Sequence, residues 1–83
     1  MPRIYYSLRI VDDQGIGIPD SEVRVHYGFT KDMRITDAEG YVTFPKKCFI
    51  SNTPYIKIYF KGQKLGSLYA ENRKVYYLTI NAN

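Results

Sequence analysis

Apolar and polar residues alternate along most of this chain with the two-residue period of a β-strand. The first alternating segment is Arg3–Val11, and no long stretch shows the period of a helix. Successive side chains of a strand point to opposite faces, so each segment has one face to bury and one to expose. The pattern predicts an all-β, seven-stranded antiparallel sandwich. The other six predicted strands are Glu22–Phe29, Met33–Thr36, Tyr41–Phe44, Tyr55–Lys61, Leu65–Tyr69 and Lys74–Asn81.

Two connections between these segments share the pattern Asp-x-x-Gly, at Asp12–Gly15 and Asp37–Gly40. An Asp at the first position of a turn accepts hydrogen bonds from backbone N–H groups further on, and a Gly at the fourth tolerates a positive φ. We therefore expect Asp12 and Asp37 to bend the chain.

Metal binding is the alternative function for these acids. If every strand reverses direction, both turns lie at the same end of the sandwich, where clustered carboxylates can bind Ca²⁺. The spacing matches no calcium loop, and Lys61 and Lys64 reach the same end, so we expect turn formation and no metal or other cofactor. The acidic residues concerned are Asp12, Asp13, Asp20, Glu22, Asp37 and Glu39.

Length and composition narrow the class of protein. The 83 residues suit a single domain, 1–83, and 16% of them are aromatic, nine being Tyr. Cys48 is alone, so no intrachain disulfide is possible and a cysteine-rich zinc site is excluded. No apolar run reaches about 20 residues, and the first residues lack the apolar core of a signal peptide. If the chain is complete, we expect a cytoplasmic protein. If it is a fragment of a larger exported protein, the sequence does not indicate its location.

The motifs resemble those of the carboxypeptidase-regulatory-like, or transthyretin-like, group of immunoglobulin-like sandwiches. The resemblance covers about residues 8–60 and implies a Greek-key sandwich used mainly as a non-catalytic accessory or interaction module. The sequence departs from the family pattern at Asp20-Ser21, where members of the family commonly have a small Gly-Ala pair. The matching elements are Asp12 and Gly15, Val23 and Val25, Thr36, Asp37 and Gly40, and Val42 and Phe44.

Lysines and arginines gather at the end of the predicted sandwich opposite the acidic turns. With a net charge of +4, such an end is a candidate site for an anionic polymer, nucleic acid included. The alternative is a solvated surface whose lysines protect the sheet edges. The candidate anion-binding residues are Arg3, Lys31, Lys46, Lys47, Arg73 and Lys74.

Tyrosines that share a strand with a basic residue form the strongest functional candidate. Tyr and Arg are the residue types that anchor protein interfaces, although Tyr also favours strands without any partner. The candidate protein-binding residues on the outward faces are Tyr5, Arg9, Tyr55, Lys57 and Tyr59.

Catalysis is not expected. The single His26 points outward from its strand without a second His to complete a triad, and Cys48 lies beside apolar Phe49 and Ile50. We predict a non-enzymatic module that presents loops and tyrosine-rich faces to a partner protein. No membrane insertion is expected, and self-association is left open. Binding of an anionic polymer through the basic end is the alternative.

Overall fold

Seven β-strands form from the segments in which apolar and polar residues alternate, as predicted. The computed structural model describes residues 3–47 and 54–80, and in this part of the chain there is no helix that could cross a membrane. Cys48 lies outside the described residues, as do the side chains of the predicted anion-binding residues Lys46 and Lys47. The strands are β1 (Arg3–Val11), β2 (Glu22–Tyr27), β3 (Thr30–Ile35), β4 (Tyr41–Lys47), β5 (Tyr55–Phe60), β6 (Gln63–Tyr69) and β7 (Val75–Thr79).

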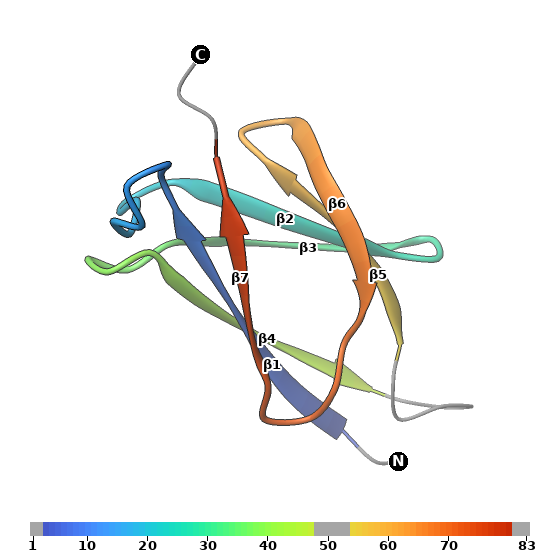
Figure 1. Cartoon of the computed structure of the whole chain (residues 1–83). Coiled ribbons are helices and arrows are strands. Elements are labelled where there is room, and N and C mark those ends of the chain that lie inside the picture. The colour runs from blue at the N-terminus through green and yellow to red at the C-terminus, as the bar shows by residue number, and fades with distance from the viewer. Residues whose placement is uncertain (1–2, 48–53, 81–83) are drawn as a thin grey trace.

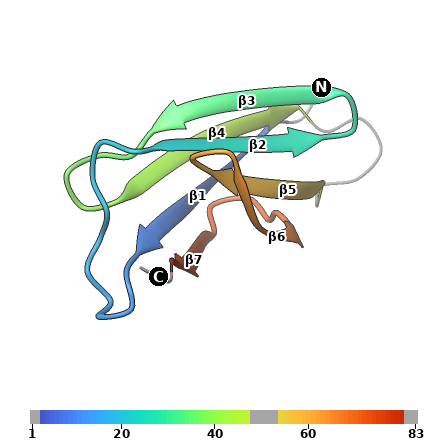
Figure 2. The ribbon, with the colours of Figure 1, turned by 90° about the horizontal axis from the view of Figure 1, so that it is seen from above.

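The strands pair into two sheets, a three-stranded one in the order β4-β1-β7 and a four-stranded one in the order β3-β2-β5-β6. Seen from above, β2 and β3 lie in one layer and β1 and β7 in the other (Figure 2). In Figure 1, β3 runs across the view and β6 runs down it, so the four-stranded sheet is strongly twisted. The arrangement is β-sandwich-like.

The prediction of a wholly antiparallel sandwich is wrong for one pair of strands. β1 pairs antiparallel with β4 but parallel with β7, in the register Ser7↔Val75 to Val11↔Thr79. The parallel pairing of β1 with β7 follows because the chain reverses direction at each connection. Strands of odd number run in the same direction, so β1 and β7 must be parallel once the fold makes them neighbours.

The core lies between the two sheets and is made by alternate residues of β1, β2, β4 and β5. Tyr6 and Phe44, which face each other across β1 and β4, stack with ring centroids 5.8 Å apart. Burial of these apolar side chains is the main term that stabilises the fold. The buried cluster comprises Ile4, Tyr6, Leu8, Ile10, Val23, Val25, Tyr27, Val42, Phe44, Ile56, Ile58, Phe60 and Ala70.

The hairpin between β2 and β3 departs from the prediction. The predicted strand Glu22–Phe29 places Phe29 on the same inner face as Val23, Val25 and Tyr27, but Phe29 is fully exposed. β2 ends at Tyr27 because Gly28, with φ +59°, turns the chain immediately after it. The alternation of apolar residues therefore continues to Phe29, two residues past the end of the strand.

Strand β3 is an edge of the four-stranded sheet and carries charges on its inner side. Asp32 and Arg34 lie opposite Val25 and Val23, and the guanidinium of Arg34 lies 5.8 Å from the ring centroid of Phe44. Charged residues that point inward at an edge strand hinder pairing with a second chain. Their side chains also form an ion pair, with 3.7 Å between Nε and Oδ2.

Two tyrosines of the fold use their hydroxyl groups in opposite ways. The Tyr6 hydroxyl is buried and has no hydrogen-bond partner among the described residues, and this burial raises the pKa of Tyr6. The Tyr76 hydroxyl accepts a hydrogen bond from the backbone N–H of Glu71 (2.9 Å) and donates one to the carbonyl of Tyr69 (3.1 Å). It thereby holds the connection between β6 and β7 against β7.

Removing each hydroxyl should have different effects on stability. Tyr6→Phe deletes a buried hydroxyl that has no partner among residues 3–47 and 54–80, so the free energy of unfolding should stay constant or rise. Tyr76→Phe is the matched control. It should lower the free energy of unfolding by about 1 kcal/mol, because the N–H of Glu71 and the carbonyl of Tyr69 lose their partner. Urea denaturation followed by circular dichroism measures both. A loss in Tyr6→Phe as large as that in Tyr76→Phe would contradict the account of Tyr6.

Candidate functional site

The two acidic turns are built by their aspartates, as expected from the sequence. Oδ1 of Asp12 accepts hydrogen bonds from the N–H groups of Gln14 (2.8 Å) and Ile16 (3.0 Å). Oδ1 of Asp37 accepts the equivalent bonds from Glu39 and Tyr41, both at 2.9 Å. These bonds lower the pKa of Asp37, because they stabilise its charged form.

The same turns pack closely against each other at Gly17. A side chain at Gly17 would overlap the carbonyl oxygen of Glu39. Thr36, which is buried, donates from Oγ1 to the carbonyl of Ile18 (2.8 Å) and accepts from the N–H of Ser21 (2.9 Å). Within residues 3–47 and 54–80, no three His, Cys, Asp or Glu side chains come together as candidate metal ligands.

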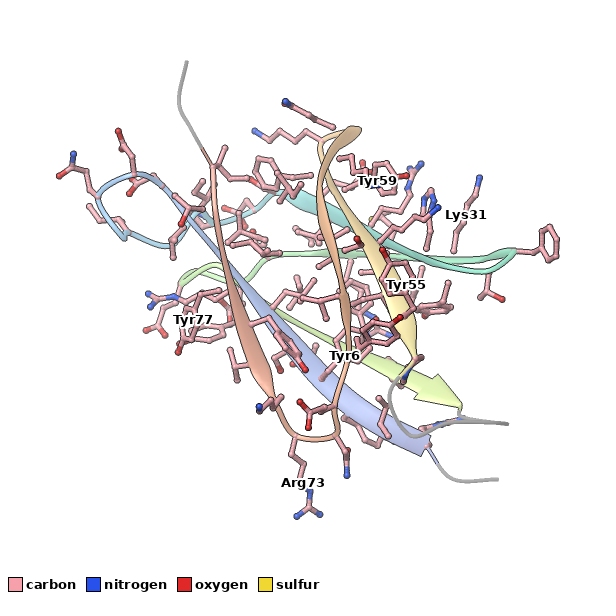
Figure 3. All side chains as sticks on the ribbon, turned by 45° about the vertical axis from the view of Figure 1, so that its right-hand side comes forward. Tyr6, Lys31, Tyr55, Tyr59, Arg73 and Tyr77 are labelled. Atoms are coloured by element: carbon pink, nitrogen blue, oxygen red, sulfur yellow. The ribbon has the colours of Figure 1, made fainter. Side chains whose placement is uncertain are left out.

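The five candidate protein-binding residues lie on opposite faces of the molecule. Tyr5 and Arg9 are on β1 of the three-stranded sheet, whereas Tyr55, Lys57 and Tyr59 are on β5 of the four-stranded sheet. In Figure 3, Tyr77 of the three-stranded sheet and Tyr59 of the four-stranded sheet lie on different sides of the molecule. The structure therefore divides these residues between two surfaces.

On the three-stranded sheet, Arg9 is occupied by contacts within the fold. Its guanidinium lies 5.0 Å from the ring centroid of Tyr41, and its Nε donates to the carbonyl of Glu39 (3.1 Å). A hydrogen bond with Tyr77 raises the pKa of Tyr41. Tyr5, four positions before Arg9 on β1, is half exposed, and its N–H donates to Oδ1 of Asn72 (3.0 Å).

The candidate anion-binding residues are also separated. Lys31 and Arg73 lie far apart in Figure 3, Lys31 near Tyr59 and Arg73 on the turn before β7. Lys74, next to Arg73, lies 3.4 Å from the carboxylate of Glu71. Arg3 is exposed at the start of β1, opposite Lys47 of β4. Lys31 therefore lies apart from the other described candidates, whereas Arg73 lies near Arg3, because its N–H donates to the carbonyl of Tyr5 (2.7 Å).

The outer face of the four-stranded sheet brings together protein-binding candidates, one anion-binding candidate and residues that the sequence analysis did not propose for any site. The strand register places His26 between Lys31 of β3 and Lys57 of β5, and places Arg24 beside Tyr59. On the far side of β5, Tyr55 pairs with Tyr69, Lys57 with Ser67 and Tyr59 with Lys64. We call this surface the aromatic-basic face; it comprises Arg24, His26, Lys31, Tyr55, Lys57, Tyr59, Lys64, Ser67 and Tyr69.

Two pairs of rings flank a hollow at the centre of the aromatic-basic face. The rings of His26 and Tyr59 have centroids 4.4 Å apart, and those of Tyr55 and Tyr69 are 4.9 Å apart. The hydroxyl of Tyr55 donates to Oγ of Ser67 (2.5 Å), which fixes the position of its ring. The hollow measures about 360 Å³ and is lined by His26, Gly28, Tyr55, Lys57 and Tyr59.

The electrostatics of this face are set by its cations. Loss of hydration and the nearby charges of Lys31, Arg24 and Lys57 lower the pKa of His26. Its Nε2 is shielded from solvent and has no hydrogen-bond partner among the described residues. Glu22, at the end of β2 beside this face, is already paired with Arg24 (2.9 Å). The face can therefore attract a negative group and also offer aromatic rings to it.

Sequence reasoning placed His26 correctly on the outward side of its strand but treated it as an isolated surface residue. Arg24 and Tyr69 were not proposed as site residues at all. The alternation of polar residues in β2 was the available signal, since it puts Arg24 and His26 on the same face. Only the pairing of β2 with β5 shows that this face continues through Lys57.

In comparisons with known proteins, the chain matches no protein-family model and no curated protein sequence. The site is therefore interpreted from its own geometry.

Protonation of Asp37 should destabilise the fold at low pH. Its pKa is lower in the folded than in the unfolded state, so its contribution is complete above the ordinary value of 3.8 and is lost as pH falls through the lower folded value. The urea midpoint of Asp37→Asn should fall less than that of the unmodified chain between about pH 5 and about pH 2.5. Asp13→Asn, in an exposed position of the other turn, is the control and should keep the full decrease. Equal decreases in the two variants would contradict this role of Asp37.

The titration of His26 tests the charge of the aromatic-basic face. His26 is the one histidine of the sequence, so its ring protons can be followed by NMR without ambiguity. Its pKa should lie below 6.5, and Lys31→Ala and Lys57→Ala should each move it towards that value, because a neighbouring positive charge is removed. Lys74→Ala, on the turn before β7, should leave it unchanged. A pKa above 6.5 would show that the cations do not dominate this face.

Proposed function

We propose that the chain is a non-enzymatic interaction module that binds an anionic partner on its aromatic-basic face. The observation that carries the proposal is the convergence of Arg24, Lys31 and Lys57 on His26, next to two pairs of aromatic rings. Cations attract an anionic partner from a distance, and aromatic rings supply contact area with little conformational entropy to lose.

Binding is favoured over catalysis by the chemistry of the hollow. Its lining contributes one imidazole, two phenols and one ammonium group, and none of these described residues is a carboxylate or an alcohol nucleophile. A nucleophile and an adjacent base are what covalent catalysis requires. The arrangement suits recognition of a charged, planar group.

We also propose that the fold is related to the transthyretin-like sandwiches that the sequence resembles. Support comes from the two Asp-x-x-Gly turns, which adopt the same hydrogen-bonded geometry, and from the two-sheet arrangement around β1 and β2. Such sandwiches commonly serve as accessory modules, which agrees with a binding role but does not specify the partner.

Heparin affinity chromatography tests the position of the anion-binding face. Lys31→Glu combined with Lys57→Glu should elute at a clearly lower NaCl concentration than the unmodified chain, because the cations facing the ligand are reversed. Arg73→Glu combined with Lys74→Glu changes the net charge equally, on the turn before β7, and should elute close to the unmodified chain. Equal shifts in the two variants would show that only net charge matters and would refute the proposed face.

A further inference from the structure

We propose that the anionic partner of the aromatic-basic face is single-stranded nucleic acid, an inference that rests on the proposed function. The face combines the two elements that such ligands require, which are exposed rings for the bases and cations for the phosphates. Both occur in alternation along β5, where Lys57 stands between Tyr55 and Tyr59.

The rings that would contact bases are accessible in the free protein. Tyr55 is 46% exposed and Tyr69 is 65% exposed, and together they form one platform. Tyr59 and His26 form the second platform on the other side of Lys57. A base that stacks on an aromatic ring uses its flat surface, so the contact tolerates any sequence.

The distance between the platforms favours a single strand over a duplex. Tyr59 is four positions after Tyr55, which corresponds to about 13 Å along an extended strand. Bases stacked in a duplex lie about 3.4 Å apart along each strand and hide their flat surfaces from a protein. A chain that contacts both platforms must therefore be unstacked and extended, with a base or sugar able to enter the hollow between them.

The cations lie where the backbone of such a strand would pass. Lys57 is between the platforms, Lys31 and Arg24 flank His26, and Lys64 lies beside Tyr59 on β6. All four are exposed, and because Arg24 is paired with the carboxylate of Glu22, the charge offered to phosphates comes mainly from Lys31, Lys57 and Lys64. An acidic peptide would satisfy these charges, but it would leave the two ring platforms without a matching planar group.

Fluorescence anisotropy with labelled probes distinguishes these ligands. The probes are an oligodeoxythymidylate of about 12 nucleotides, a duplex of similar length and a polyglutamate peptide of similar charge, each titrated between about 50 and about 200 mM NaCl. The single strand should bind most tightly, and its affinity should fall with salt. Tyr59→Ala and Tyr55→Ala should each raise its Kd by roughly 5- to 150-fold, whereas Tyr59→Phe should retain binding because the ring remains.

Further variants separate stacking from charge. Lys57→Ala should reduce the dependence of log K on log salt by about 0.7, the value for one phosphate contact to a single strand. Tyr77→Ala, on the opposite sheet, is the matched control and should bind like the unmodified chain. Circular dichroism of every variant confirms that it remains folded.

The outcomes separate this inference from the proposed function. If polyglutamate or the duplex binds as tightly as the single strand, or if Tyr59→Ala and Tyr55→Ala keep full affinity, the partner is not single-stranded nucleic acid and anion binding stands. If none of the three probes binds, both proposals fail.

Discussion

Every feature of this molecule depends on the burial of one face of each sheet against the other. Neither sheet can hide its apolar side chains alone, and each strand has only two sides, so packing the sheets together leaves two outer faces for solvent. With 83 residues the interior holds one layer of side chains from each sheet. Even a polar hydroxyl, that of Tyr6, is accepted inside without a partner among the described residues. Function must therefore be carried by the outer faces, the edges or the connections.

These parts of the surface are used differently. The acidic connections have structural roles. Asp12 and Asp37 accept the hydrogen bonds that close their turns, and Gly17 allows the two turns to pack closely. The edge strand β3 carries Asp32 and Arg34, which hinder pairing with another chain. On the three-stranded sheet, Arg9 packs on Tyr41 and bonds to the Glu39 carbonyl. The outer face of the four-stranded sheet differs from these, because it combines cations with a hollow lined by Tyr55, Tyr59, His26 and Lys57 and by no carboxylate.

This contrast explains why the binding proposals concern the aromatic-basic face. Lys31 and Lys57 lie on opposite sides of His26, so both cations can face one anionic ligand placed over His26. Gly28 contributes to the same site in a different way, since its positive φ ends β2 and its lack of a side chain leaves the hollow open beside Tyr55.

The strands, their inward residues and both Asp turns follow from the sequence, because alternation and turn chemistry act between residues that are close along the chain. The limits of that reasoning are visible at Phe29, where a local turn ends the strand before the apolar pattern does. Which strands become neighbours was decided only by the tertiary structure. It made β1 and β7 a parallel pair, separated Tyr5 from Tyr59, and brought Lys31, His26 and Lys57 into one row. The physical reason is that strand order depends on how two whole sheets bury their apolar faces, a condition that no short stretch of sequence contains.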